Sequence, residues 1–508
     1  MTKVTLKLFA FYDILRSMQN IEFNTSGWQD TIADGFTALN TQRVANAIAS
    51  HVLESKEYGF NGAEYRQYIA SIKNPPRKPI VIVGYDTRYL SEYFARHIAG
   101  VLASHNITVK LADSETPLPV VAKAVIDNCA VGGAVITADE QPATVNGLKW
   151  ISFWGSSATP EILFDIGNRI SSSASNNPKN NSWDIESLPP LVEFVDLRSK
   201  YLKDVSSLID EKTLKKSTLK IGLDSLHSSA RTYLKPYLEK LGFKVTEING
   251  ERDVFFGEDI PSVDANGLSE LSKLVKKNKL NIGLACSGDR FGIVDSNGTW
   301  VSPNTIFGLI LEHLVINKGM KGRVCRNVFT SNFVDTVAKS HGLEIREAPV
   351  GSGHIGMLMK AGQYIMGCEE YGGLSLINHI PESDGMAACL LVLEKIVQER
   401  KPLEKIIERL HKQYGEFKHT KLSVPAHEVR LVDIMERLKN KPPLDLGGFS
   451  VWRIDQIDGF KFILKDGSWL GITVSEPESV VLIYAESGDA KKLNTLMSAG
   501  KNILKGKF

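Results

Sequence analysis

The sequence predicts an α/β fold, with three successive α/β domains that contain mixed sheets and a smaller C-terminal α+β domain. Short β-branched runs alternate with longer amphipathic segments, a rhythm typical of sheets covered by helices. This rhythm occurs three times before about residue 415. The remaining tail differs, because it contains closely spaced short strands with Asp-Gly turn signals.

The first unit contains the clearest β-α-β pattern. The buried strand in "KPIVIVGYDTR" is followed by "LSEYFARHIAGVLASHN", whose apolar residues have helical spacing, and then by the strand "ITVKLAD". The Ser/Asn-rich segment 171–184 predicts an exposed loop near the end of this unit. We place the first domain at residues 1–205.

The pattern then recurs in two further units. "LKIGLDSLHSSA" precedes a helix that ends at "EKLGF", the strand "KVTEI" and the run "LNIGLACSGDRFGIVDSNG", which defines a second domain at residues 206–301. "GRVCRNVFTS", the helical "NFVDTVAKSHG" and the strand "LEIREAPVG" define a third domain at residues 302–416. The short strands of the tail and the helix "AKKLNTLMSAGKNIL" form a fourth domain at residues 417–508.

The composition describes an ordinary globular protein. Of 508 residues 43% are apolar and 23% charged, and a net charge of +2 predicts neither a nucleic-acid nor a membrane partner. Five scattered cysteines without a C-x-x-C pair favour a reducing compartment, so we expect a cytoplasmic protein. The first 20 residues contain a short apolar patch interrupted by Asp13, which we interpret as an added helix or a loose leader, not a signal peptide.

The loop "TADEQP", residues 137–142, is the first candidate site. It directly follows the apolar run "GGAVI", and a polar loop after a buried strand is a frequent place for ligand contacts. From the residues alone, Asp139 is anything from a backbone cap to a nucleophile.

Seven phrases in order resemble the α-D-phosphohexomutase family, the phosphoglucomutases and phosphomannomutases. They are "IEFNTSGWQDTIADGFT", "IVIVGYDTRYLSEYFA", "TPLPVVAKAVIDNCAVGGAVITADEQPATVNGLKW", "GLACSGDRFGIVDSNG", "MGCEEYGGLSL", "HIPESDGMAACLLVLE" and "IDGFKFILKDGSW", and they span nearly the whole chain from about Ile21. The resemblance implies four domains around a central cleft, with one loop from each domain contributing to it. It also implies a phosphoserine that exchanges its phosphoryl group with a hexose phosphate, and a magnesium ion held by three aspartates.

The donor loop departs from the family pattern Thr-Ala-Ser-His-Asn-Pro. Asp139 occupies the serine position and Glu140 the histidine position. An aspartate carries one negative charge where phosphoserine carries about 1.5 to 2, and an aspartyl phosphate is labile. Three interpretations stay open: a polar loop in a decayed site, a mimic of phosphoserine, and a working aspartyl nucleophile. Both carboxylates are expected to repel an incoming phosphate.

Two basic residues of the family's lining survive near this loop. Arg88 in "GYDTR" is expected either to pair with Asp86 or to face the Asp139 loop, and Lys149 follows in "NGLKW". By resemblance, Asp139, Arg88 and Lys149 are the candidate catalytic residues.

The metal loop is shortened. The family's Asp-Gly-Asp-Ala-Asp-Arg becomes "SGDR", which keeps Asp289 as its single carboxylate. Carboxylates at alternate positions of a tight loop converge on one hard cation, and a single one holds magnesium weakly. The alternative is a short turn in which Asp289 pairs with Arg290 or caps the backbone.

The sugar-reading loop matches best. Glu369 and Glu370 are adjacent carboxylates that can accept hydrogen bonds from two vicinal hydroxyls. Tyr371 replaces the family's serine, and is expected to fill the sugar pocket or to stack on a ring. The alternative is a loop that retains its shape without contacting sugar.

The phosphate clamp is altered. Its family pattern is Arg-Pro-Ser-Gly-Thr-Glu-Pro, and an ungapped alignment places Thr473 at the arginine position and keeps Ser475. Glu476 and Pro477 then replace the Gly-Thr pair; a gapped alignment on Ser475 also loses the arginine. A guanidinium and free N–H groups suit a phosphate dianion, whereas a glutamate repels it and a proline lacks the donor.

The resemblance implies an intramolecular phosphotransferase that acts on hexose phosphates, but the donor, the metal ligands and the clamp arginine are all changed. The first hypothesis is a catalytically degenerate homologue that binds a sugar, a sugar phosphate or a protein partner in the old cleft. The second is an active mutase or phosphatase that uses Asp139, and the third a scaffold or interaction protein. Enzymatic activity, glucose-type or mannose-type ligand, and monomer or dimer stay open.

Overall fold

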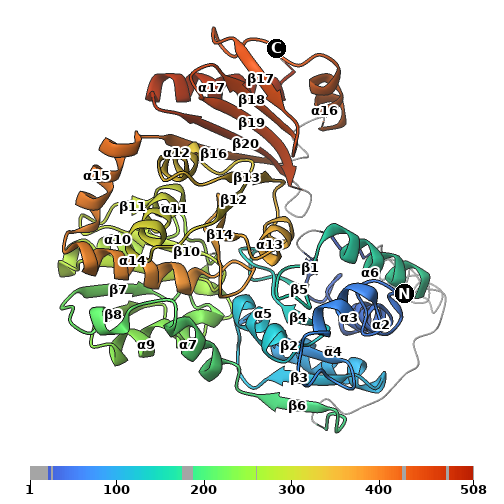
Figure 1. Cartoon of the computed structure of the whole chain (residues 1–508). Helices are drawn as coiled ribbons and strands as arrows, with labels where there is room; N and C mark the ends of the chain where they lie inside the picture. The colour runs from blue at the N-terminus through green and yellow to red at the C-terminus, as the bar shows by residue number, and fades with distance from the viewer. Residues whose placement is uncertain are drawn as a thin grey trace, which may run out of the picture.

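In the computed structural model, residues 21–24, 27–173, 187–258, 260–425, 431–475 and 480–506 are described. The leader at residues 1–20, most of the expected loop at 171–184, and the pair Glu476 and Pro477 lie outside these residues. Four sheets follow one another along the chain (Figure 1). The predicted fold class is therefore confirmed: three α/β domains precede a C-terminal domain with an antiparallel sheet.

Domain I is built on a six-stranded mixed sheet of order β1-β5-β4-β2-β3-β6. Its elements are β1 (Trp28–Thr31), α2 (Ala38–Glu54), α3 (Ala63–Ile69), β2 (Ile80–Tyr85), α4 (Ser91–Ser104), β3 (Thr108–Ala112), α5 (Leu118–Asp127), β4 (Gly132–Ile136), β5 (Val145–Ser152), α6 (Pro160–Ser173) and β6 (Val192–Val195). The expected loop at 171–184 was placed slightly too early, because α6 continues to Ser173. Buried Ile162, Ile166 and Ile170 recur every fourth residue and prolong that helix.

Domain II contains a five-stranded sheet of order β11-β10-β9-β7-β8. Helix α7 (Arg198–Ser206) spans the expected boundary between residues 205 and 206. The elements that follow it are α8 (Glu211–Leu214), β7 (Lys220–Asp224), α9 (Leu234–Lys240), β8 (Lys244–Ile248), α10 (Ser269–Asn278), β9 (Ile282–Cys286), β10 (Phe291–Val294) and β11 (Trp300–Val301), with short 3-10 turns at Ser229–Thr232 and Phe256–Glu258. The parallel strands β8, β7 and β9 are followed by the antiparallel β10 and β11.

Domain III has a four-stranded sheet of order β13-β12-β14-β15, parallel except for the last pair. Its elements are α11 (Pro303–Glu312), continued by a π-helical turn at His313–Asn317, β12 (Arg323–Asn327), α12 (Asn332–Ser340), β13 (Ile345–Ala348), α13 (Ser352–Lys360), β14 (Tyr364–Glu369), β15 (Gly373–Leu376), α14 (Gly385–Glu399) and α15 (Leu403–Tyr414). The buried helix α14 packs on strands of both domain II and domain III, so the two domains share one apolar core.

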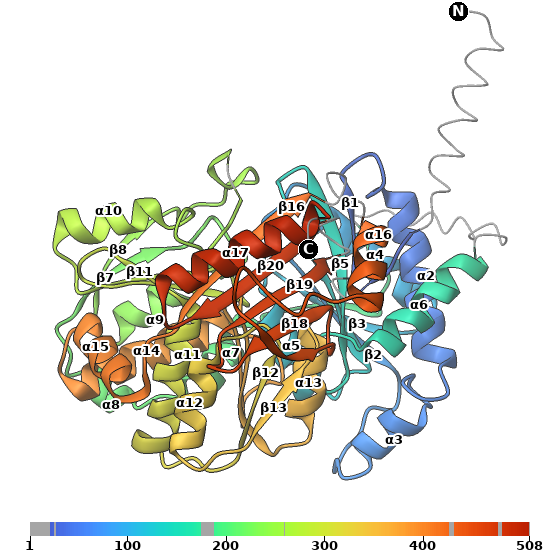
Figure 2. The same cartoon turned by 90° about the horizontal axis from the view of Figure 1, so that it is seen from above.

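Domain IV is a five-stranded antiparallel sheet of order β16-β20-β19-β18-β17. Its elements are β16 (Lys418–Pro425), α16 (Leu431–Asn440), β17 (Val451–Asp455), β18 (Phe460–Leu464), β19 (Trp469–Ser475), β20 (Val480–Ser487) and α17 (Ala490–Leu504). Helix α17 lies across β19 and β20 (Figure 2). The rings of Phe329 and Tyr484 stack with centroids 4.6 Å apart and attach this domain to domain III.

Candidate functional site

Three of the predicted site loops occupy the same place in three similar sheets. Each connects a strand that has one parallel neighbour to an antiparallel partner: β4 to β5, β9 to β10 and β14 to β15. The loops are residues 137–144, 287–290 and 370–372. An isolated bridge between Arg290 and Gly373 joins the second loop to the third. The shared topology therefore brings together residues that lie far apart in the sequence.

Asp139 is held in the first loop by its backbone and by one ion pair. Its φ of 52° is left-handed, a conformation that aspartate tolerates better than most residues. Its carboxylate Oδ2 lies 2.5 Å from Lys149 Nζ on β5. Burial alone raises the pKa of Asp139, but the charges of Lys149 and Arg290 outweigh burial and lower it. Asp139 is therefore an ionised, internally neutralised carboxylate.

Arg88 is fully buried and stabilises the Asp139 loop from behind. Its guanidinium donates to the backbone carbonyls of Asp139 at 2.7 Å and Gln141 at 2.8 Å, and to two more at residues 142 and 145. Its Nε also lies 3.2 Å from Asp86 Oδ2. Both alternatives drawn from the sequence thus hold at once. Because its donors point to backbone, Arg88 is a positioning residue of the loop.

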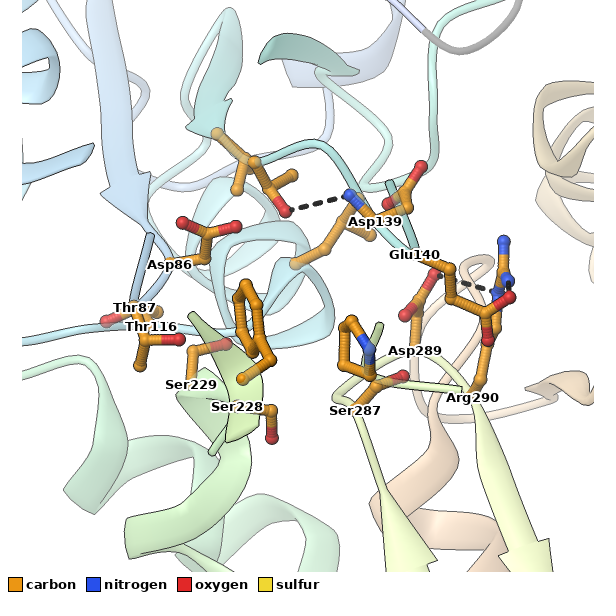
Figure 3. Close-up of a pocket in the computed structure, with 15 residues that line it drawn as sticks. Asp86, Thr87, Thr116, Asp139, Glu140, Ser228, Ser229, Ser287, Asp289 and Arg290 are labelled. Atoms are coloured by element: carbon orange, nitrogen blue, oxygen red, sulfur yellow. Dashed lines mark hydrogen bonds and ion pairs between the residues drawn. The ribbon is translucent and has the colours of Figure 1, made fainter. Parts of the chain in front are cut away.

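Glu140 and Arg290 connect domain I to domain II. Arg290 Nη1 lies 2.6 Å from Glu140 Oε2, and Figure 3 shows the two side chains turned toward each other. The guanidinium also lies over the ring of Tyr371, 4.5 Å from its centroid. Arg290, in a loop of domain II, therefore contacts loops of domains I and III. The expected repulsion between the two loop carboxylates and a phosphate is moderated here, because Asp139 and Glu140 each have a cationic partner.

Asp289 is the single carboxylate of the shortened metal loop. Its Oδ2 lies 4.0 Å from Arg290 Nε, a longer distance than the 2.6 Å between Arg290 and Glu140. Burial raises the pKa of Asp289, which disfavours the ionised form that a metal requires. Among the described residues, no group of three histidine, cysteine or carboxylate side chains is placed to hold a metal. The donors present around Asp289 therefore do not fit magnesium.

The sugar-reading loop contributes two carboxylates with different surroundings. Glu370 Oε1 accepts a hydrogen bond of 2.7 Å from the Tyr484 hydroxyl, and its other oxygen accepts from Asn327. Glu369 is fully buried, and burial raises its pKa to about 8, assisted by the negative charge of Glu382. The ring of Tyr371 faces the guanidinium of Arg290, and its stacking on a sugar ring stays a prediction.

The described residues at the aligned clamp positions, Thr473 and Ser475, are neutral and have an acidic neighbour, Asp458. Thr473 Oγ1 donates a 2.8 Å hydrogen bond to Asp458 Oδ1, and Asp458 Oδ2 accepts one of 2.9 Å from the Val350 amide. Ser475 ends β19 and lies in the same wall. Asp458 thus stands beside the residue that aligns with the family's arginine.

These residues line two neighbouring pockets, which share Asp139, Glu140, Asp289 and Arg290. The smaller one, drawn in Figure 3, is lined by Asp86, Thr87, Thr116, Asp139, Glu140, Ser228, Ser229, Asp289 and Arg290, among others. The larger one is a cleft of about 410 Å³ among all four domains. Its lining includes Asp139, Glu140, Lys149, Asp289, Arg290, Val350, Glu370, Tyr371, Glu382, Ser383, Lys421, Asp458, Thr473 and Ser475. Such a volume falls in the usual range of small-ligand sites, roughly 300–1,000 Å³.

Most predicted site residues line this cleft, but Arg88 and Glu369 lie behind its surface. The sequence analysis missed the roles of Arg290 and Asp458. Opposite charges in the segments "ADEQ" and "SGDR" are the signal that could have suggested the Glu140–Arg290 pair. Asp458 gave no signal beyond a turn position in "QIDGF".

Comparison with known proteins agrees with this architecture. Family profiles for "Phosphoglucomutase/phosphomannomutase, alpha/beta/alpha domain I", "domain II" and "domain III" match residues 62–177, 199–298 and 302–414. The chain therefore belongs to the phosphoglucomutase/phosphomannomutase family of α-D-phosphohexomutases. No helix in the described ranges combines the length and apolarity needed to cross a membrane.

Named relatives cover most of the chain. A phosphoglucomutase/phosphomannomutase of Thermococcus kodakarensis is 26% identical, with 84% of this chain and 90% of the relative covered. A phosphoglucosamine/phosphogalactosamine mutase of Sulfurisphaera tokodaii is 27% identical, with 84% and 91% covered. A crystal structure from Burkholderia thailandensis, a phosphoglucomutase/phosphomannomutase family protein, superposes with a TM-score of 0.75, at 17% identity, covering 96% of this chain and 98% of that chain. This last similarity concerns the fold alone.

Proposed function

We propose that this chain is a phosphohexomutase homologue that has lost phosphoryl transfer and binds a hexose-type ligand in the cleft. The observation that carries the proposal is the ion pair between Asp139 and Lys149 at the donor position. A neutralised carboxylate is a weak nucleophile, because the charge that would attack phosphorus is engaged with an ammonium group. A phosphoryl group would therefore have to be accepted by Oδ1 beside this ion pair, or by Oδ2 after the contact with Lys149 is broken.

The surrounding changes act in the same direction. The donors around Asp289 fit magnesium poorly, and the clamp wall offers Thr473 and Asp458 where a guanidinium would suit a phosphate. Metal and electrostatic contributions to phosphoryl transfer are commonly 100-fold or more each. Their combined loss supports a binding protein. Magnesium, which family membership suggests, would depend on a phosphate for most of its ligands.

Retention of ligand binding is supported by the third-domain loop. Glu370 lines the cleft with its carboxylate fixed by Tyr484 and Asn327. A carboxylate has about four acceptor positions, so capacity for ligand hydroxyls remains after these two hydrogen bonds. The pre-organised acceptor is the basis for preferring a sugar ligand to a scaffold without any ligand.

A coupled assay tests the loss of catalysis. The full chain is supplied with glucose 1-phosphate or mannose 1-phosphate, magnesium and a hexose bisphosphate, and formation of the 6-phosphate is followed. We expect no turnover above that of Asp139→Asn. Turnover that Asp139→Asn abolishes would establish instead the alternative enzyme that uses Asp139 as its acceptor.

A ligand screen tests the binding half of the proposal. Thermal unfolding is measured with unphosphorylated hexoses and with hexose phosphates, for the native chain and for Glu370→Ala. We expect at least one hexose-type ligand to raise the unfolding temperature of the native chain, with a smaller shift for Glu370→Ala. No shift with any of them would favour the scaffold protein.

A further inference from the structure

The charge of the cleft departs from that of a phosphate site. Among the described residues, its lining contains six carboxyl groups and three lysine or arginine side chains. The carboxyl groups are Asp139, Glu140, Asp289, Glu370, Glu382 and Asp458, and the cations are Lys149, Arg290 and Lys421. His354 adds no charge near neutral pH, because burial lowers its pKa. An excess of carboxylates repels a phosphate dianion and attracts a cation.

Two of the three cations are already engaged. Lys149 pairs with Asp139 at 2.5 Å, and Arg290 pairs with Glu140 at 2.6 Å while lying over Tyr371. A phosphate that recruited either cation would leave a partly buried carboxylate without its partner, which is strongly unfavourable. Lys421 is exposed on β16, with its ammonium 5.7 Å from the ring centroid of Tyr484. A single exposed lysine lacks the bidentate geometry of an arginine clamp.

The carboxylates of domains III and IV are held differently. Glu382 accepts from the Ser157 amide at 2.5 Å and from the Ser383 amide at 2.9 Å. Asp458 accepts from Val350 and Thr473, as described above. These partners are neutral, so they fix the positions of both carboxyl groups without adding a counter-charge. Burial raises the pKa of Glu382, which favours its neutral form, so the charge of this wall rests on Asp458.

A further buried carboxyl group lies behind this wall. Ser383, which lines the cleft, donates to Glu369 Oε1 at 3.3 Å. Glu369 Oε2 is buried and has no hydrogen-bond partner among the described residues. Buried polar atoms without a partner are rare, and such an atom can be completed by an ordered water.

We propose that the domain III–IV wall of this cleft binds a hexose that carries a protonated amino group and no phosphate. Asp458 provides the negative charge for the ammonium group, Glu382 lines the same wall with its carboxyl group fixed by two backbone amides, and Glu370 accepts hydrogen bonds from the sugar hydroxyls. The proposal rests on the proposed binding function and specifies its ligand class. A cleft of about 410 Å³ accommodates one such sugar with bound water.

Calorimetric titration of the full chain with four matched sugars tests the ligand class. The sugars are glucosamine, glucose, glucosamine 6-phosphate and glucose 1-phosphate, near pH 6.5, where the amine is protonated. We expect glucosamine to bind at least about tenfold tighter than glucose, equivalent to about 1.4 kcal/mol, and the phosphorylated sugars to bind more weakly than their parents. Added salt should weaken the binding of glucosamine more than that of glucose.

The variant Asp458→Asn separates the charge from the shape of the wall. We expect it to reduce the preference for glucosamine over glucose about tenfold, because charge-assisted hydrogen bonds are about twice as strong as neutral ones. Asp455→Asn on β17 is the matched control, because that aspartate does not line the cleft and should leave the preference unchanged.

Each outcome distinguishes this inference from the function beneath it. Equal affinity for glucose and glucosamine overturns the charge argument but leaves a sugar-binding protein. Tighter binding of glucosamine 6-phosphate or glucose 1-phosphate than of the parent sugar also overturns it. If none of the four sugars binds, sugar binding in the cleft is itself contradicted.

Discussion

The two sides of the cleft use carboxylates in opposite ways. On the side of domains I and II, Asp139 and Glu140 are paired with Lys149 and Arg290 at 2.5 and 2.6 Å. On the side of domains III and IV, carboxylates such as Asp458 accept from amides and hydroxyls. The first arrangement neutralises charge and links domains, whereas the second keeps charge available to a ligand. The proposed loss of phosphoryl transfer on one side is therefore compatible with the proposed ligand recognition on the other.

The largest expected effect is loss of Arg88, which supports the paired side. Arg88→Ala should lower the free energy of unfolding by about 3–5 kcal/mol, because several carbonyls and Asp86 lose a buried charged partner. Urea denaturation measures the change. Arg96→Ala is the control, since that arginine pairs with Glu92 at the surface and should contribute less than about 1 kcal/mol. Similar values for both variants would contradict the role given to Arg88.

The next effect concerns Glu369 behind the sugar-reading loop. Its pKa is about 8 in the folded protein, above the ordinary value of 4.5. Between these pH values the carboxyl of Glu369 keeps its proton in the folded state but has lost it in the unfolded chain. Its contribution to the free energy of unfolding is therefore fully present below pH 4.5 and is lost as pH rises toward 8. We expect titration of Glu369 to lower the free energy of unfolding by roughly 2 kcal/mol between pH 5 and 8. This is within the limit of about 1.4 kcal/mol per pH unit that one titrating group can contribute.

Glu369→Gln isolates that contribution, because the amide has nearly the same shape and does not titrate. Denaturant midpoints at several pH values should decline less for the variant than for the native chain. Glu344→Gln is a suitable control at an exposed position of the same domain. Parallel pH profiles for the native chain and Glu369→Gln would show that Glu369 is already ionised at pH 5.

A smaller effect is expected from the ion pair between domains I and II. A double-mutant cycle with Glu140→Gln and Arg290→Met should give a coupling energy of about 1–2 kcal/mol, because the pair is partly buried. The surface pair of Glu92 and Arg96, measured in the same way, should give about 0.3–0.5 kcal/mol. A coupling at Glu140 and Arg290 no larger than this reference would mean that the contact does not link the domains.

Much of the fold follows from local sequence patterns. The helix expected in "AKKLNTLMSAGKNIL" is Ala490–Leu504, and the strand expected in "KVTEI" is Lys244–Ile248. Apolar periodicity acts over a few residues, so these elements are readable without tertiary information. The expected loop at residues 171–184 starts too early, because the helix α6 continues to Ser173. The serines at the end of this helix favour loops, but its apolar face extends the helix.

The site was less predictable. Ordered motifs located its loops, but the partners of each charge depend on how the domains dock. Glu140 and Arg290 are 150 positions apart in the numbering, and no local rule pairs them. The role of Arg88 in positioning the Asp139 loop depends on its hydrogen bonds to backbone carbonyls, which have no sequence signature. Charge pairing across domain boundaries is a property of packing.

The central claim is that Asp139 no longer takes part in phosphoryl transfer. The most direct measurement is the mass of the peptide that contains Asp139, after the full chain has been incubated with magnesium and glucose 1,6-bisphosphate and then quenched in acid. The structure predicts an unmodified peptide and no hexose monophosphate above the protein-free blank. A phosphorylated Asp139 that appears together with hexose monophosphate would contradict it.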